Sequence, residues 1–211
     1  MPATRIKICG ITAPAALDAA IAARADYMGL MFYAPSPRNL AFDQAKSLAD
    51  RAGGAISRVG VFVDPADDLL RDAVAAGRLD TLQLHRVAAA RRAEIAARFN
   101  LPVWAVVEVS KPADLAAWHH LEGCDRVIFD AKTPKGALPG GMGLAFDWSM
   151  LRGLSHAVPW GLAGGLSPDN VGEAIRVTGA PLVDASSGLE SAPGVKDPDR
   201  IRAFAAAVQA A

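Results

Sequence analysis

Short apolar runs alternate along the whole chain with longer segments in which apolar residues recur every three or four positions. The apolar runs are nearly continuous, which is typical of parallel strands that are covered on both faces. The segments between them have the period of amphipathic helices. The pattern predicts eight strands, at Arg5–Cys9, Tyr27–Phe32, Ser57–Val63, Thr81–His85, Val103–Val109, Arg126–Asp130, Trp160–Ala163 and Leu182–Ser186.

A helix is predicted after each of these strands. Several of the helical segments open with proline, whose fixed φ suits the first turn and whose missing N–H is not needed there. Ser167 and Asp197 stand directly before two such prolines and are the predicted N-caps. The predicted helices are Pro14–Arg24, Asp43–Arg51, Pro65–Ala76, Ala88–Phe99, Pro112–Trp118, Asp147–Leu151, Pro168–Val177 and Pro198–Gln209.

Eight βα units in about 200 residues match the small end of a closed (β/α)8 barrel. No linker or shift of composition divides the chain, so we predict a single-domain α/β protein over residues 1–211, a (β/α)8 TIM barrel. An open, doubly wound sheet is the alternative, because strand alternation alone does not prove closure. In a barrel, the carboxyl ends of the strands and the loops that follow them face the active site.

Composition and charge narrow the classes of function. The chain has 22 Lys and Arg against 22 Asp and Glu, so it lacks the basic surplus of a nucleic-acid-binding protein. Its apolar stretches are far shorter than a membrane span, and its N-terminus lacks the apolar core of a secretory signal. Two cysteines and four histidines indicate neither a disulfide framework nor a metal site. We expect a cytoplasmic protein with no membrane or nucleic-acid partner.

Two candidate catalytic side chains stand at predicted strand ends. Cys9 closes the first strand directly before Gly10, and Asp130 closes the sixth strand before a long glycine-rich stretch. A thiol and a carboxylate on distant strands of one barrel can face a substrate from opposite sides, which suits proton removal from a carbon and proton delivery to an oxygen. The alternatives are a small buried apolar side chain for Cys9 and a solvated carboxylate for Asp130. Cys124 is interpreted as a structural thiol.

Glycine-rich and serine-rich loops follow the seventh and eighth strands. Gly164 and Gly165 follow the seventh strand, and Ser187 and Gly188 follow the eighth. Glycine lets backbone N–H groups approach an anion closely, and in (β/α)8 enzymes these two loops commonly hold a phosphate. We therefore predict a phosphate site here, with glycines that merely make tight turns as the alternative.

Two more residues of the predicted rim suit substrate binding. Arg38 ends the proline-stiffened loop Ala34–Arg38, and a guanidinium held by such a loop suits bidentate capture of a carboxylate. The alternative is an exposed surface arginine. His85 closes the fourth strand, where it can bind a substrate or cap the barrel core. Lys7 shares the inward side with Cys9 but lies two residues lower, so alternation argues against its reaching the rim.

Taken together and in order, these motifs resemble one known family, the N-(5′-phosphoribosyl)anthranilate isomerases of tryptophan biosynthesis. The resemblance runs from about Ile6 to Phe204, and each motif is weak alone. The motifs are Lys7-Ile8-Cys9-Gly10, Phe32-Tyr33, Ser36-Pro37-Arg38, Val59-Gly60-Val61-Phe62-Val63, Gln83-Leu84-His85, Asp130-Ala131-Lys132, Phe146-Asp147-Trp148, Leu162-Ala163-Gly164-Gly165-Leu166 and Asp184-Ala185-Ser186-Ser187-Gly188-Leu189-Glu190.

The resemblance implies an Amadori rearrangement of a phosphosugar, without a metal or an organic cofactor, in a monomeric enzyme. It implies that Asp130 is the general acid that protonates the ribose ring oxygen and that Cys9 is the general base that takes the C2′ proton. It also implies that Arg38 holds the anthranilate carboxylate and that His85 and Asp184 line the pocket. The phosphate ligands would be Gly165, Ser187 and Gly188, beside Gly164.

Two positions depart from the family pattern. Arg86 stands where the family usually has glycine, so it can narrow the rim or add an anion contact, and Met142 stands where a small or polar residue is more usual. The rival enzyme is a bifunctional isomerase that also serves histidine biosynthesis, which would carry an aspartate in place of Cys9. The rival without activity is a barrel that only binds a phosphosugar, which the presence of both Cys9 and Asp130 disfavours.

Overall fold

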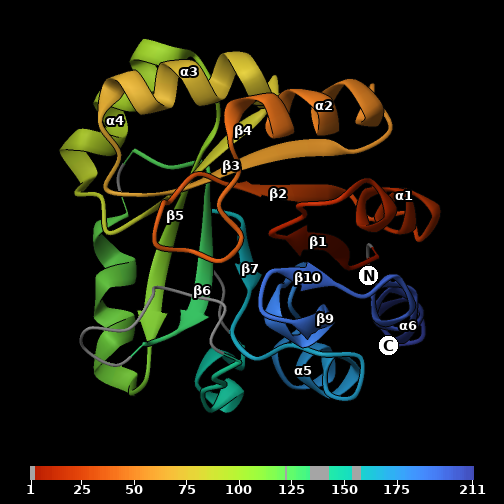
Figure 1. Ribbon diagram of the computed structural model, residues 1–211. Coiled ribbons are helices and arrows are strands. Elements are labelled where there is room, and N and C mark those ends of the chain that lie inside the picture. The colour runs from red at the N-terminus through yellow and green to blue at the C-terminus, as the bar shows by residue number, and fades with distance from the viewer. Residues whose placement is uncertain (1–2, 122, 134–142, 154–157) are drawn as a thin grey trace.

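Eight parallel strands close into a barrel in the order β1 to β8, and β1 pairs with β8 (Figure 1). The structure, a computed structural model, describes residues 3–121, 123–133, 143–153 and 158–211. The predicted barrel is confirmed, and the open sheet is wrong. The strands are β1 (Arg5–Cys9), β2 (Tyr27–Met31), β3 (Ser57–Val63), β4 (Thr81–His85), β5 (Val103–Val109), β6 (Arg126–Ala131), β7 (Trp160–Leu162) and β8 (Leu182–Ala185).

Helical segments follow the strands and cover the outside of the barrel (Figure 1). Within the described ranges, none of them is long and apolar enough to cross a membrane. The α-helices are α1 (Pro14–Ala22), α2 (Phe42–Ala52), α3 (Asp67–Gly77), α4 (Ala89–Phe99), α5 (Val171–Thr178) and α6 (Pro198–Gln209). The 3-10 helices are η1 (Pro112–His120), η2 (Trp148–Leu151) and η3 (Ser187–Leu189).

The segments after β5 and β6 are 3-10 helices, although the sequence predicts a helix of the α period at each. In η1 the Asp114 carboxylate accepts hydrogen bonds from the N–H groups of Ser110 and Lys111, which holds the start of the segment in a tight turn. The second segment, η2, is a single turn whose N-cap is Asp147.

The two predicted N-caps have different outcomes. Asp197 caps α6, because its carboxylate accepts hydrogen bonds from the N–H groups of Asp199 and Arg200. Ser167 does not cap α5, which begins at Val171 rather than at Pro168. The Ser167 N–H donates to the Asn170 side chain at 2.8 Å, so the intervening residues form a turn between the β7 loop and the helix.

A hairpin that the sequence analysis does not predict follows η3. Its strands, β9 (Glu190–Ala192) and β10 (Val195–Lys196), pair antiparallel and lie outside the barrel sheet. Strands of three and two residues are too short to carry a hydrophobic period, so the apolar pattern gives no signal for them.

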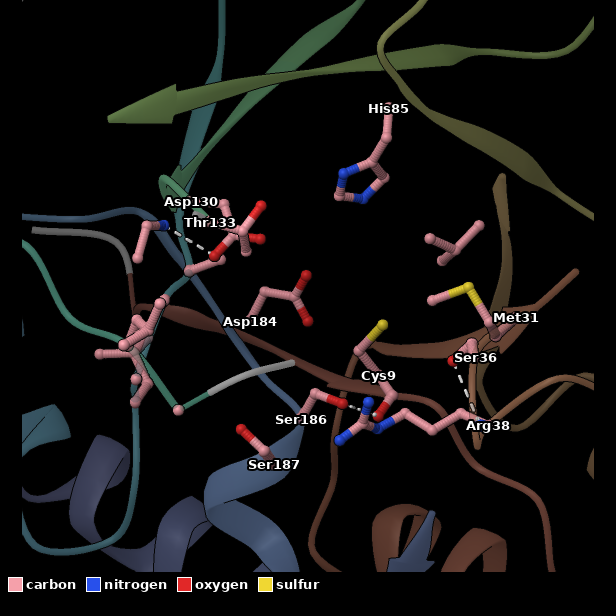
Figure 2. Close-up of a pocket in the computed structure, with 18 of the residues that line it drawn as sticks. Cys9, Met31, Ser36, Arg38, His85, Asp130, Thr133, Asp184, Ser186 and Ser187 are labelled. Carbon is pink, nitrogen blue, oxygen red and sulfur yellow. Dashed lines mark hydrogen bonds between the residues drawn. The ribbon is translucent and has the colours of Figure 1, made fainter. Parts of the chain in front are cut away.

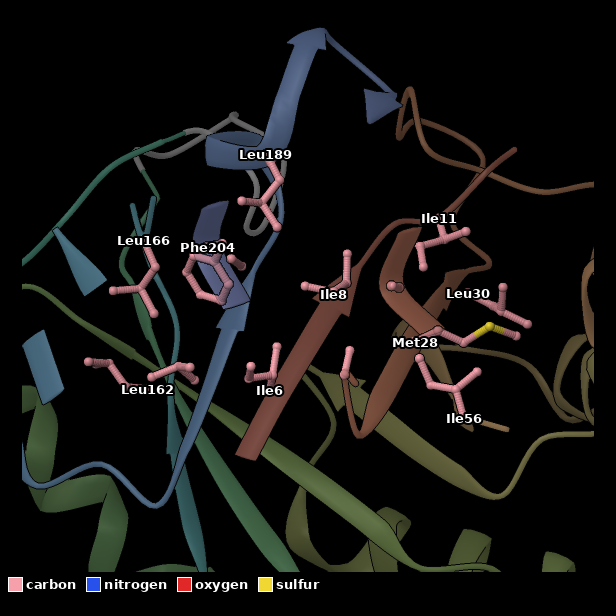
Figure 3. Packing of buried hydrophobic residues seen from close by; sticks show 14 of the residues in the cluster. Ile6, Ile8, Ile11, Met28, Leu30, Ile56, Leu162, Leu166, Leu189 and Phe204 are labelled. Atoms are coloured by element: carbon pink, nitrogen blue, oxygen red, sulfur yellow. The ribbon is translucent and has the colours of Figure 1, made fainter. Parts of the chain in front are cut away.

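The core has two layers that follow from the alternation of side chains along each strand. Along β1, Ile6 and Ile8 point outward and pack in the layer beneath the helices, where Phe204 of α6 also lies (Figure 3). Lys7 and Cys9 occupy the alternate positions, so they face the barrel interior. The interior apolar layer consists of Cys9, Met31, Val59, Val61, Trp104, Ile128, Ala163 and Leu182. Charged side chains at the rim are therefore supported by a packed floor.

The packing of Leu79, in the segment between α3 and β4, against β3 depends on Gly60. A Cβ at this position would lie 2.3 Å from Leu79 Cδ1 and 2.7 Å from Phe62 Cε2. We therefore expect Gly60→Ala to destabilise the fold by about 1–3 kcal/mol through overpacking. Urea unfolding measures the change. The control is Gly54→Ala at an exposed turn, where an added Cβ meets nothing within 4 Å; equal stability of the two variants would contradict the packing account.

Candidate active site

One cavity at the carboxyl ends of the strands collects most of the rim residues that the sequence singles out (Figure 2). Its lining comes from the ends of distant strands and from the loops after β2, β7 and β8. Gly188 is not part of the lining, although it belongs to the same loop as Ser187. The predicted residues that line the cavity are Cys9, Arg38, His85, Asp130, Gly164, Gly165, Asp184 and Ser187.

A buried ion pair joins the first and last strands beneath this cavity. Lys7 and Asp184 are register partners in the β1–β8 pair, and Lys7 Nζ lies 2.7 Å from Asp184 Oδ2. The Lys7 side chain is fully buried. Burial disfavours its charged form, but Asp184 and Cys9 outweigh burial and raise the pKa of Lys7. The ammonium therefore stays charged beneath the cavity, whose lining does not include Lys7.

The Cys9 thiol is buried in the interior layer at the floor of the cavity. Burial raises the pKa of this thiol, whereas the positive charges of Lys7 and Lys196 act to lower it. Gly29 on β2 leaves room for the sulfur, because a Cβ there would lie 2.8 Å from Cys9 Sγ. The resting group is thus a thiol with cations beside it, and additional positive charge in the cavity would favour the thiolate.

Asp130 lies across the cavity from Cys9, with Asp184 between them (Figure 2). Its Oδ1 accepts a hydrogen bond from the Ala131 N–H at 2.8 Å. Burial is the main cause that raises the pKa of Asp130 to about 7, and the nearby charge of Asp184 adds to it. Asp130 is therefore a carboxylic acid that can hold and release a proton near neutral pH.

His85 points into the cavity as a neutral imidazole (Figure 2). Burial, followed by the charges of Lys7 and Arg86, lowers its pKa to about 3. The Gln83 amide nitrogen lies 3.2 Å from His85 Nε2. In the described part of the chain His85 Nδ1 and Asp184 Oδ1 have no hydrogen-bond partner, which suits both atoms to a ligand.

Arg38 is buried at the rim, so the alternative of an exposed surface arginine is wrong. Its Nε and Nη2 lie 2.7 Å from the two carboxylate oxygens of Glu190, at the start of β9. Glu190 also forms an ion pair with Lys196 of β10. The bidentate edge formed by Nε and Nη2 is thus occupied by Glu190, and a ligand carboxylate would have to meet another part of the guanidinium.

Close packing leaves no room for a side chain at three glycines of the loops after β7 and β8, against β6 at Gly164, against Leu144 and Ala145 at Gly165, and against the β7 loop at Gly188. Gly164 and Gly165 have φ values of 88° and 65°, in the region that favours glycine. A Cβ at Gly165 would lie 2.9 Å from the Leu144 carbonyl oxygen, and one at Gly188 would lie 2.2 Å from the Leu166 carbonyl oxygen. Ser187 lines the cavity beside them. Two glycines and a hydroxyl therefore line this part of the cavity, and the phosphate site stays a prediction.

Several residues around the cavity are absent from the sequence-based assignment. Lys7 does not line the cavity, and it acts on the site from below through its contact with Asp184. Gly194 lies between Glu190 and Lys196 in the sequence. A glycine between oppositely charged residues is the one local signal that could have indicated the hairpin. The residues that the sequence analysis does not assign to the site are Lys7, Gln83, Thr133, Glu190 and Lys196.

Two residues depart from the family pattern, Arg86 and Met142, and the structure describes only Arg86. Arg86 has a φ of 58°, in the left-handed region that favours glycine, which explains why glycine is usual there. Its side chain is directed to Glu108, with Nη2 3.5 Å from Oε1, and it does not line the cavity. The expectation that Arg86 narrows the rim or adds an anion contact is therefore wrong. Met142 lies outside the described residues, as does the glycine-rich stretch 134–142.

Residues 6–207 match the sequence profile of the family described as N-(5′phosphoribosyl)anthranilate (PRA) isomerase. The N-(5′-phosphoribosyl)anthranilate isomerase of Paramagnetospirillum magneticum is 54% identical over 202 residues, which cover 94% of each chain. The phosphoribosyl anthranilate isomerase of Thermotoga maritima is similar in structure, with a TM-score of 0.88 at 31% identity, over 99% of this chain and 100% of that one.

A second solved structure of phosphoribosyl anthranilate isomerase contains a ligand. That enzyme is in complex with reduced 1-(O-carboxyphenylamino)-1-deoxyribulose 5-phosphate. Its TM-score to this chain is 0.83 at 29% identity, and the match covers 99% of this chain and 100% of that chain.

The raised pKa of Asp130 predicts a pH dependence of stability. The folded protein holds a proton up to about pH 7 that an unfolded aspartate, with a usual pKa of 3.8, has already released. Stability is therefore greatest at low pH in this window and is lost as the pH rises through about 4 to 7. Asp130→Asn lacks this loss of stability. The melting temperature of the variant minus that of wild type should therefore increase as the pH rises from about 5 to 8.

Thermal unfolding of both proteins across this range measures the effect. The matched control is Glu173→Gln, which makes the same change of acid to amide at an exposed position of α5. A constant difference between Asp130→Asn and wild type at every pH would show that Asp130 is ionised in the folded protein.

Proposed function

The chain belongs to the N-(5′-phosphoribosyl)anthranilate isomerase family, and we propose that it converts N-(5-phosphoribosyl)anthranilate to 1-(2-carboxyphenylamino)-1-deoxyribulose 5-phosphate. Family membership makes it an isomerase of tryptophan biosynthesis. The observation that carries the proposed mechanism is the pairing of a buried carboxylic acid, Asp130, with a buried thiol, Cys9, on opposite sides of one cavity. Such a pair suits an Amadori rearrangement, which moves protons between the atoms of a single substrate.

Asp130 is the general acid in this proposal. It donates its proton to the ribose ring oxygen, the bond between that oxygen and C1′ breaks, and the nitrogen lone pair forms an open-chain iminium. A pKa of about 7 supports the role, because the group is largely protonated up to neutral pH and is still acidic enough to donate. Asp184 keeps negative charge nearby and so favours the protonated form.

Cys9 is the general base. The iminium withdraws electrons from C2′, which makes the C2′ proton acidic enough for a thiolate. The positive charge of the iminium adds to that of Lys7, and both favour loss of the thiol proton to solvent, which leaves the thiolate that takes the C2′ proton. Removal of the C2′ proton gives an enolamine. Protonation at C1′ and loss of the C2′ hydroxyl proton then give the ketone, so no oxidant, metal or organic cofactor is required.

The remaining cavity residues bind the two ends of the substrate in this account. Arg38 receives the anthranilate carboxylate, and His85 and Asp184 lie along the sugar with their unpaired polar atoms. The phosphate lies at the loops after β7 and β8, where backbone N–H groups of Gly164, Gly165, Ser187 and Gly188 are its proposed ligands. The exclusion of side chains by the close packing at these glycines supports this assignment.

The proposal also covers the oligomeric state and the cellular location of the enzyme. We propose a monomer in the cytoplasm, since the substrate is a small phosphosugar and its cavity is formed within one chain. A bifunctional isomerase of histidine and tryptophan biosynthesis is disfavoured by Cys9, since that enzyme would be expected to carry an aspartate there.

Loss of either reacting group should remove most of the activity. We expect Cys9→Ser and Asp130→Asn each to lower turnover of freshly made phosphoribosylanthranilate by about 10²-fold or more, because each removes one proton transfer. The loss of substrate fluorescence follows the reaction. Both variants should still bind the reduced product, since neither substitution removes a proposed ligand of its carboxylate or phosphate.

Cys124→Ser is the matched control, since the Cys124 thiol donates to the Leu121 carbonyl oxygen away from the cavity and should not affect turnover. Near wild-type turnover in Cys9→Ser or Asp130→Asn would refute the assignment of acid and base. The same assay with an aminoaldose of the histidine pathway distinguishes the bifunctional alternative, which turnover of that compound would restore.

A further inference from the structure

The Glu190 carboxylate holds the guanidinium of Arg38 on the side away from the cavity. Glu190 accepts hydrogen bonds from Nε and Nη2 of Arg38, each at 2.7 Å, in a planar bidentate pair. Both side chains are almost fully buried, with exposed fractions of 7% for Arg38 and 4% for Glu190. Arg38 lines the cavity, whereas Glu190 does not, so Glu190 lies behind the guanidinium as seen from the cavity.

Glu190 is itself held by the hairpin to which it belongs. Lys196, on the opposite strand, has a fully buried side chain whose ammonium forms an ion pair with Glu190 Oε1. The Gly194 N–H donates to Glu190 Oε2 at 3.3 Å. Burial favours the neutral acid, but Arg38 and Lys196 outweigh it and lower the pKa of Glu190. The carboxylate is therefore ionised and has partners on both oxygens.

The hairpin is fastened to the loops that carry Cys9 and Arg38. Gly194 has a φ of 82°, and a Cβ there would lie 2.5 Å from the Pro37 carbonyl oxygen. The Thr12 hydroxyl donates to the Gly194 carbonyl oxygen at 3.0 Å. On the other side, a Cβ at Gly10 would lie 2.5 Å from Arg38 Cδ, so the stem of Arg38 crosses the backbone directly after Cys9.

Burying these charged side chains costs solvation free energy, and the barrel does not need them in order to close. Charged groups lose solvation when they are buried, and a buried pair often adds no net stability over well-packed apolar residues. The hairpin strands are not part of the barrel sheet. What the cluster provides is a guanidinium fixed at one place on the cavity wall, and a fixed guanidinium suits recognition of a carboxylate on a ligand.

We propose that Glu190 and Lys196 are positioning residues that hold the Arg38 guanidinium where it meets the carboxylate of the substrate, and that the β9–β10 hairpin thereby sets specificity for a carboxylated aromatic amine. The inference rests on the proposed role of Arg38. It further implies that the substrate carboxylate approaches the guanidinium away from the edge formed by Nε and Nη2, which Glu190 occupies.

The test compares two ligands that differ in one group. The first is the reduced product, reduced 1-(O-carboxyphenylamino)-1-deoxyribulose 5-phosphate, and the second is the same compound without the ring carboxylate. Calorimetry gives the Kd of each for wild type, Glu190→Gln, Arg38→Ala and the double variant. We expect Glu190→Gln to weaken binding of the carboxylated ligand by about tenfold or more and to change binding of the other by less than about twofold.

The two substitutions should not be additive, because Glu190 acts through Arg38. In the Arg38→Ala background, Glu190→Gln should cause no further loss of affinity for the carboxylated ligand. The conservative variant Glu190→Asp keeps the charge on a shorter stem and should fall between wild type and Glu190→Gln. In steady state, Glu190→Gln should raise KM more than it lowers kcat. Glu173→Gln, on the exposed face of α5, should change neither Kd.

Each contrary result is distinct. Equal losses for both ligands would mean that Glu190 only maintains the fold, which would overturn the inference. A loss in Arg38→Ala but not in Glu190→Gln would overturn the inference and leave the proposed role of Arg38 intact. No loss in Arg38→Ala would overturn both. If Glu190→Gln does not fold, Lys196→Met applies the same comparison, and unchanged discrimination between the ligands in that variant would overturn the inference.

Discussion

The buried ion pair between Lys7 and Asp184 joins the architecture of this barrel to its chemistry. It lies between the first and last strands, at positions that are register partners, so it spans the seam at which the barrel closes. Two charges in the interior are tolerable only when each compensates the other, and removal of either one leaves an unpaired buried charge. The carboxylate and the ammonium are thus mutually dependent, and both face the floor of the cavity.

This pair gives the two reacting groups different electrostatic surroundings. Asp184 lies between Asp130 and Cys9 (Figure 2), and its negative charge favours the protonated form of Asp130. Lys7 places positive charge beside Cys9, which favours the thiolate. Enzymes that use an acid and a base at one pH commonly separate their protonation states by such local differences. Each partner also acts in the opposite direction on the other group, since Asp184 raises the pKa of Cys9 and Lys7 lowers that of Asp130, but in both cases this is the smaller of the two effects.

The apolar pattern predicts the barrel well, because its parallel strands are covered on both faces and read as continuous apolar runs. The ends of β1, β3, β4 and β5 agree with the prediction at both boundaries. The sequence predicts helices at η1 and η2 but not their 3-10 form, and it does not predict the β9–β10 hairpin, because strands of three and two residues carry no hydrophobic period.

The residues of the site also fall into those that the sequence pattern predicts and those that it does not. Cys9, His85 and Asp130 are predictable because they close strands, and the rim of a barrel is defined by strand ends. Lys7, Glu190 and Lys196 are not, because their place depends on partners that are far away in the sequence. The Arg38–Glu190 pair spans 152 residues, and the Lys7–Asp184 pair spans 177. Periodicity assigns a face to a side chain, but it does not reveal which opposite charge that side chain will meet.

The most direct test of the central claim is the pH dependence of kcat/KM for the isomerisation, in wild type and in Asp184→Asn. Cys9 must lose the proton that the resting thiol holds, because its pKa is raised, whereas Asp130, with a pKa of about 7, must keep its proton. Wild-type kcat/KM should therefore rise with pH up to about pH 7 and level off above it. Loss of the Asp184 charge should move this break to lower pH, because the repulsion that favours protonated Asp130 is gone. A wild-type profile without a break near pH 7, or a break that stays in place in Asp184→Asn, would contradict the account.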